Sequence, residues 1–123
     1  MRLLAFLSIL ALSGGPALAD PCADVAKSYS AIRLEACAAD TFAKADASLN
    51  EAYQTVVRHQ KENGRNLKPL VAAERAWIVE RNARCDQKAK EYDLIDATGS
   101  AAILDCKTEW TKVRITTLND NLH

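Results

Sequence analysis

Glycine and proline are scarce in this chain of 123 residues, which contains four glycines and three prolines. After residue 19 only Gly64, Gly99, Pro21 and Pro69 remain. Strand-rich folds need turn residues at short intervals and alternate apolar with polar positions, and the chain shows no sustained alternation of that kind. Its Ala-rich and charge-rich stretches instead repeat apolar residues three and four positions apart, which predicts an all-α fold.

The chain also lacks an excess of charge, since it has 16 basic and 16 acidic residues. This balance argues against nucleic acid and anionic membranes as partners, because both select for basic domains. No G-x-S-x-G elbow, H-E-x-x-H pair, P-loop or Gly-rich dinucleotide turn occurs. The two histidines, His59 and His123, are too far apart for a local metal motif. We therefore expect no catalytic residue, no cofactor and no metal site.

The only long apolar run lies at the start, where residues 3–12 follow Met1-Arg2 and precede a small-residue segment ending at Ala19. This pattern is typical of a secretory signal peptide. A membrane anchor is the alternative, but the run is well short of the roughly 20 residues that span a bilayer. Cys22 does not directly follow the small-residue site, which argues against a lipid anchor. We expect a signal peptide over residues 1–19 and one periplasmic or secreted domain over residues 20–123, not inserted in a membrane.

All four cysteines, Cys22, Cys37, Cys85 and Cys106, lie in the predicted exported part. An even number of cysteines in a small secreted domain indicates disulfides. A four-thiolate zinc site is the alternative, but such sites usually bring their ligands in close pairs. Successive separations of 15, 48 and 21 residues do not fit that spacing. Two disulfides are the prediction.

Residues that end or cap helices divide the chain into three predicted helices, over residues 32–62, residues 66 to about 92, and residues 100 to about 118. Asn63-Gly64 is a typical C-terminal stop, because glycine accepts the left-handed conformation that ends a helix. Asn66 is the expected cap of the second helix, and Gly99-Ser100 reads as a turn followed by a serine cap. Short links favour antiparallel neighbours. The predicted fold is a three-helix antiparallel bundle with an N-terminal arm, stapled by two disulfides.

Antiparallel packing bears on the disulfide pairing. Cys85 and Cys106 lie at similar distances on either side of the loop near Asp96, so an antiparallel pair of helices brings them together. Cys22 would then tie the N-terminal arm to Cys37. The pairing Cys37–Cys106 with Cys22–Cys85 stays open, because all four residues can lie at one end of the bundle.

One face of the predicted second helix carries an indole, a guanidinium and a sulfur, where a plain core helix would carry only aliphatic side chains. Trp77, Arg81 and Cys85 recur at four-residue steps and so share one face. A guanidinium on a packing face must be paired or reach water. Folding the second helix back at Gly64 places Arg81 opposite residues 46–50, which predicts an Arg81–Asp46 pair with Asn50 or Tyr53 nearby.

These residues resemble the LprI-type lysozyme inhibitor family of small exported helical domains, and the resemblance covers the mature chain. It includes the four cysteines and an ordered set of further positions, namely Phe42, Asp46, Leu49-Asn50, Tyr53, Arg75-Ala76-Trp77-Ile78, Arg81, Gly99-Ser100, Thr111, Arg114 and Leu118. The resemblance implies that Asp46, Asn50, Tyr53, Arg75, Trp77, Arg81 and Arg114 form the structural family motif. The chain departs from the family at Glu74, often glutamine there, and at Glu80, Asn82 and Trp110.

The resemblance implies a protein that binds and blocks lysozyme in the periplasm or outside the cell. Blocking the cleft requires binding and no chemistry. We expect the contact surface at the second loop, at residues Glu91, Asp93, Asp96, Gly99 and Ser100, whose acidic members suit a cationic lysozyme. The competing interpretation is a non-inhibitory protein that docks to another envelope component.

Overall fold

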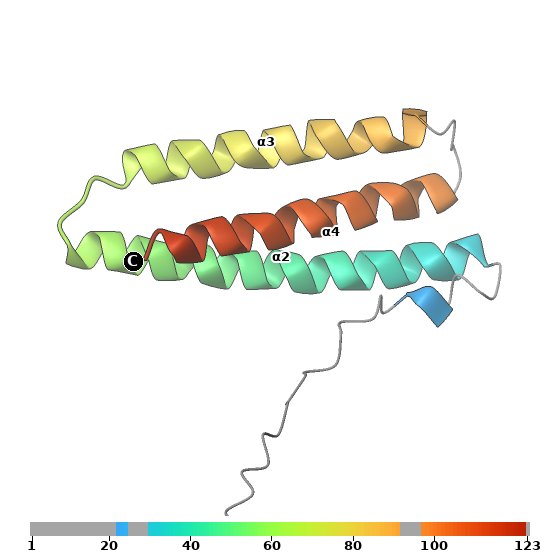
Figure 1. Ribbon diagram of the computed structural model, residues 1–123, viewed down its shortest axis with the longest axis horizontal. Helices are drawn as coiled ribbons and strands as arrows, with labels where there is room; N and C mark the ends of the chain where they lie inside the picture. Colours follow the sequence, from blue (N-terminus) through green and yellow to red (C-terminus); the bar gives the residue numbers. More distant parts are fainter. Residues whose placement is uncertain (1–21, 25–29, 92–96, 123) are drawn as a thin grey trace, which may run out of the picture.

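Three long helices make up nearly all of the computed structural model, which describes residues 22–24, 30–91 and 97–122 (Figure 1). They are α2 (Ala31–Glu62), α3 (Lys68–Glu91) and α4 (Ala97–Asp120). No strand occurs in these ranges. The all-α prediction is confirmed, and the first two helices begin or end within two residues of the predicted bounds. The predicted signal peptide lies outside the described residues and stays a prediction.

The helices run alternately up and down, and α4 lies between the other two (Figure 1). It packs against α2 along most of its length and against α3 on its other side. The chain therefore places its last helix between the other two.

An aliphatic core forms between α2 and α4. Leu49, Ala52 and Val56 recur at the spacing of one helix face and are buried against Leu118. Partly buried side chains pack around them, namely Tyr53, Leu70, Trp77, Ile115 and Leu122. Burial of apolar area in this cluster supplies a hydrophobic driving force for joining α2 to α4.

Helix α3 is held differently. Its buried residues are Glu74, Arg81 and Cys85, and none of them is an aliphatic side chain. A carboxylate and a guanidinium that lose water need hydrogen-bond or ionic partners to offset the free-energy cost of desolvation. The attachment of α3 therefore depends on specific polar pairs and a disulfide more than on an apolar stripe.

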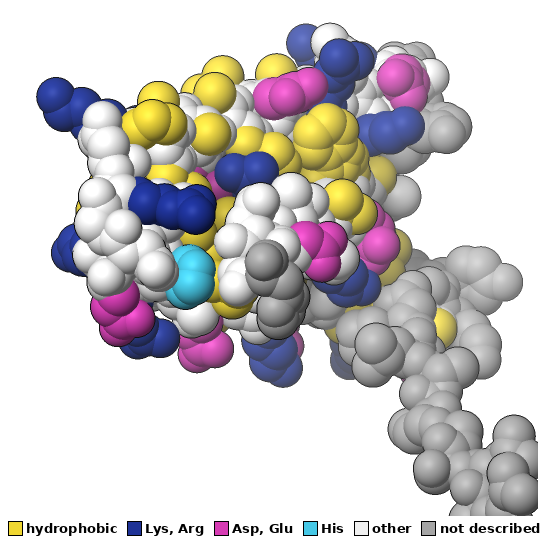
Figure 2. All heavy atoms as spheres, turned by 60° about the vertical axis from the view of Figure 1, so that its left-hand side comes forward, with side chains coloured by type: hydrophobic (Ala, Val, Ile, Leu, Met, Phe, Trp, Pro, Cys, Tyr) yellow, Lys and Arg dark blue, Asp and Glu magenta, His cyan; other side chains and the backbone are white. Residues whose placement is uncertain are grey.

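The turn between α2 and α3 has a well-defined backbone. Gly64 has a φ of 66°, its amide donates to the Lys61 carbonyl at 3.0 Å, and the Arg65 amide donates to the Gln60 carbonyl at 2.9 Å. These two bonds form a Schellman motif and confirm Asn63-Gly64 as the helix stop. Lys and Arg side chains project from this end of the molecule (Figure 2).

Two predicted helix starts need correction. Helix α3 begins at Lys68, so Leu67 occupies the cap position, and Asn66 lies one residue earlier and accepts a bond from the Lys68 amide at 3.0 Å. Helix α4 begins at Ala97, so the prediction of a turn and serine cap at Gly99-Ser100 is wrong. Both residues lie in the first turn of α4, where burial of Gly99 in the bundle outweighs its weak helix propensity.

Candidate functional site

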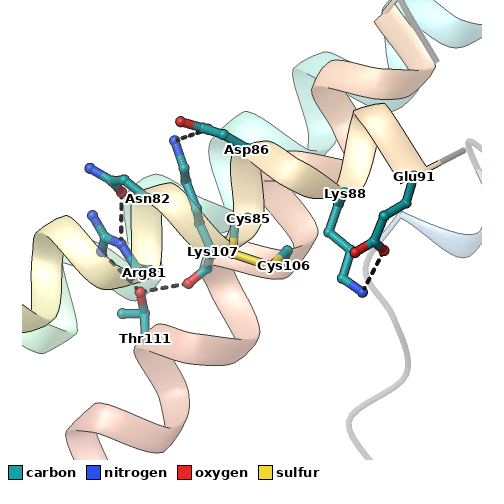
Figure 3. Close-up of a disulfide and its surroundings, with 9 residues drawn as sticks. All are labelled: Arg81, Asn82, Cys85, Asp86, Lys88, Glu91, Cys106, Lys107 and Thr111. Carbon is teal, nitrogen blue, oxygen red and sulfur yellow. Dashed lines mark hydrogen bonds and ion pairs between the residues drawn. A yellow bond between two sulfur atoms is a disulfide. The ribbon is translucent and has the colours of Figure 1, made fainter. Parts of the chain in front are cut away.

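Both predicted disulfides are present. Cys22 and Cys37 are joined with a Cα separation of 5.8 Å, and Cys85 and Cys106 with one of 5.5 Å. The second bond links α3 to α4 in the interior, since Cys85 is fully buried (Figure 3). This local pairing excludes the alternative in which Cys37 joins Cys106.

The Arg81 guanidinium occupies the centre of the interface between the three helices. Its Nη1 lies 3.5 Å from Asp46 Oδ1 on α2, so the predicted pair forms. The same nitrogen donates to Thr111 Oγ1 on α4 at 3.2 Å, and Nε donates to Asn82 Oδ1 at 3.2 Å (Figure 3). The guanidinium also lies over the rings of Phe42 and Trp77, at 5.2 and 5.1 Å from their centroids. Arg81 is thus a structural tie.

Substituting Arg81 with lysine is expected to lower the free energy of unfolding by about 1–2 kcal/mol, because an ammonium cannot reproduce the planar fork that bonds Thr111 and stacks on two rings. Asp46→Asn is expected to cost less, about 0.5 kcal/mol, since Asp46 is 45% exposed and its attraction is screened by water. Thermal unfolding followed by circular dichroism measures both. If both variants melt at the same temperature as the wild type, the bonds of Arg81 do not stabilise the helix interface.

A second buried pair joins α3 to α4. Arg114 donates from Nε at 2.9 Å and from Nη2 at 2.7 Å to the same oxygen, Oε2 of Glu74. The two side chains are only 16% and 10% exposed. The Arg114 guanidinium lies 5.6 Å from the Trp77 ring centroid. Trp77 therefore contacts Arg81 and Arg114, and packs against the apolar core as expected.

Asn50, Tyr53 and Arg75, three of the predicted motif residues, line a shallow cavity of about 260 Å³ between α2 and α3. Tyr53 is half-buried against the core, but Asn50 and Arg75 are exposed. Asn50 is therefore not a buried ligand of Arg81. Its place beside that guanidinium is taken by Thr111, a fully buried residue of α4.

The residues expected to contact a partner are only partly described. Glu91 is exposed at the end of α3, where its carboxylate accepts from Lys88 Nζ at 3.4 Å. Ser100 is half-buried and Gly99 is buried, so Gly99 offers no surface of its own. Asp93 and Asp96 lie outside the described residues. A contact at this end stays a prediction for Glu91, Asp93, Asp96 and Ser100.

An apolar groove of about 350 Å³ runs between α3 and α4 and was not predicted. It is lined by Trp77, Glu109, Trp110, Val113, Arg114 and Thr117. Val113 is 67% exposed, and Trp110 is half-buried. The signal for this groove was present at Trp110 and Val113, two apolar residues three positions apart on α4, but spacing alone does not tell an exposed face from a packed one.

Within the described ranges, no three His, Cys, Asp or Glu side chains are placed to hold a metal ion. All four cysteines are used in the two disulfides. No helix among the described residues is long and apolar enough to span a membrane.

The fold and the buried ion pairs define a small domain of three helices with two disulfides, one between α3 and α4 and one between the N-terminal arm and α2. A family model described as lysozyme inhibitor LprI matches residues 22–118, and the chain belongs to this family. The match spans all four cysteines and the three helices up to Leu118. The family is one of inhibitors. No curated protein and no solved structure matches the chain.

Proposed function

We propose that this protein is exported, binds lysozyme and blocks it by occupying the active cleft. The observation that supports this function best is the family match over residues 22–118. Two disulfides suit export, because they persist in oxidising compartments. The Cys85–Cys106 bond also fixes α3 against α4, which reduces the ordering cost of association.

An assay of cell-wall lysis tests the function directly. Oxidised protein comprising residues 20–123 is added to chicken-type, goose-type and invertebrate-type lysozymes, and the clearing of a bacterial cell-wall suspension is followed. We expect at least one type to be inhibited at near-equimolar protein. The protein after reduction and alkylation of its disulfides serves as the control. No inhibition of any type at a large molar excess would refute the proposed function.

The second candidate function is docking to another envelope protein without inhibition. The groove between α3 and α4 favours it, because Trp110 and Val113 form an apolar surface of the kind that partners cover. An affinity experiment on periplasmic extract with wild type and Val113→Glu distinguishes the two. A protein retained by the wild type and lost by the variant, together with no effect on lysozyme, would favour docking.

A further inference from the structure

The turn between α2 and α3 concentrates positive charge in an otherwise balanced chain. Residues 58–68 contain four cations, Arg58, Lys61, Arg65 and Lys68, and one carboxylate, Glu62. The rest of residues 20–123 holds 11 basic and 15 acidic residues. All four cations are exposed. We call these four side chains the basic tip; its end of the bundle faces the reader in Figure 2.

The basic tip also differs from the rest of the described surface in how many of its cations are paired. Outside it, seven of the ten described cations lie 3.9 Å or less from a carboxylate, namely Lys44, Arg81, Arg84, Lys88, Lys107, Lys112 and Arg114, and the other three, Arg33, Arg75 and Lys90, are far apart in the sequence. Among the described residues no carboxylate pairs with any cation of the basic tip, where Arg58 donates only to Thr55 Oγ1 at 3.3 Å. Its charges therefore stay available to an anionic partner.

The backbone that carries the basic tip is fixed before any partner arrives. Besides the two Schellman bonds, the Asn63 side-chain amide donates to the His59 carbonyl at 2.7 Å, and the Asn66 side chain accepts from the Lys68 amide. A convex turn held in this way inserts into a concave surface at a lower entropic cost than a loop that must first order itself.

We propose that the basic tip is the part of this protein that enters the lysozyme cleft; this inference rests on the proposed function. Lysozyme catalysis requires two carboxyl groups on opposite sides of the scissile bond, one of them ionised. Arg65, at the apex, offers a planar fork that matches a carboxylate, and Lys61 and Lys68 add positive charge on either side of it. The acidic remainder of the chain orients the molecule, since a cationic lysozyme attracts that part while its cleft attracts the basic tip.

Charge reversal at the basic tip tests the location. The tip variant Lys61→Glu with Arg65→Glu is compared with the control variant Arg33→Glu with Lys90→Glu. The control residues are also exposed and form no ion pair among the described residues, but they lie at the opposite end of the bundle. Both variants gain the same negative charge, so any general attraction to a cationic lysozyme rises equally. Circular dichroism verifies that each is folded, and Arg65→Ala supplies a milder third variant.

The inhibition constant is measured against the lysozyme type that the wild type inhibits most strongly. We expect the tip variant to be weaker by about 30-fold or more, since a charged interfacial contact is lost and reversed, and the control variant to stay within about threefold of the wild type. We also expect a trisaccharide of N-acetylglucosamine bound in the cleft to compete with the wild-type protein.

Two results would overturn the inference. One is a tip variant that inhibits as well as the wild type, and if the control variant alone is impaired, the contact lies at the end that carries Glu91. The other is an equal loss of inhibition in both variants. In each of these cases wild-type inhibition still stands, so the proposed function survives. If the wild-type protein inhibits no lysozyme, both the proposed function and the inference about the basic tip are wrong.

Discussion

Replacing Glu74 with alanine is expected to lower the free energy of unfolding by about 3 kcal/mol, because the change leaves the Arg114 guanidinium in the bundle without its counter-ion. Arg114 makes both of its short bonds to one carboxylate oxygen and is only 16% exposed, so water cannot replace the lost partner fully. In a domain of this size the melting temperature should fall by more than about 10 °C.

Two matched variants separate the charge from the packing. Glu74→Gln keeps an acceptor oxygen and is expected to cost about 1 kcal/mol, since a neutral bond replaces a charge-assisted one. The double variant Glu74→Leu with Arg114→Met removes both charges and should recover most of the stability lost in Glu74→Ala. A melting temperature for Glu74→Ala equal to that of the wild type would show that the pair contributes nothing in solution.

The arrangement of the helices could be predicted because local signals agree with each other. Leu49, Ala52 and Val56 repeat at helical spacing, and Gly64 ends the first helix with the motif expected of it. The scarcity of other turn residues leaves room for only long helices. Once antiparallel packing is assumed, the register around the second loop is enough to bring Cys85 to Cys106.

The start of α4 could not be predicted in the same way. Gly99 is a local turn signal, and Ser100 is a good helix cap. The helix nevertheless begins at Ala97, and Gly99 is buried inside its first turn. A local propensity of about 1 kcal/mol against glycine is small beside the packing of a whole helix, which is why tertiary contacts decided this boundary.

The buried pair of Glu74 and Arg114 was missed for a different reason. The two residues are 40 positions apart, and their contact depends on the rotation of α3 against α4, which spacing does not specify. One signal was available, since Glu74 lies seven residues before Arg81 and therefore on the same helix face. A carboxylate on the face that carries Trp77 and Cys85 needs a cation as much as Arg81 needs an anion.

Candidate partner contacts were the least predictable part. A residue that holds the fold, such as Arg81, can be recognised because its spacing places it on a buried helix face. Residues that contact a partner are exposed, and nothing in a single sequence distinguishes them from other exposed residues. The excess of cations in residues 58–68 is present in the sequence, but only the structure shows that these cations lack carboxylate partners, because position in the chain does not tell an unpaired cation from a paired one.

Removal of the disulfide between α3 and α4, through Cys85→Ala with Cys106→Ala, is expected to lower the free energy of unfolding by about 3 kcal/mol from loop-closure entropy alone. An additional local effect is expected in α3, since this helix buries Glu74 and Arg81 but no aliphatic side chain. Without the disulfide, α3 is held by its two ion pairs and by the partly buried Leu70 and Trp77, so it should open more readily than α2 and α4 do.

The other disulfide provides the matched control, because Cys22→Ala with Cys37→Ala opens a loop of similar length and has a similar entropic effect. That bond attaches the N-terminal arm to α2 and crosses no helix interface. Hydrogen exchange of backbone amides measures local opening. Amides of α3 should exchange faster in the Cys85 and Cys106 variant, while those of the core around Leu49 and Val56 change only with global stability. Equal protection of α3 in the two variants would mean that the side chains around Trp77 hold this helix without covalent help.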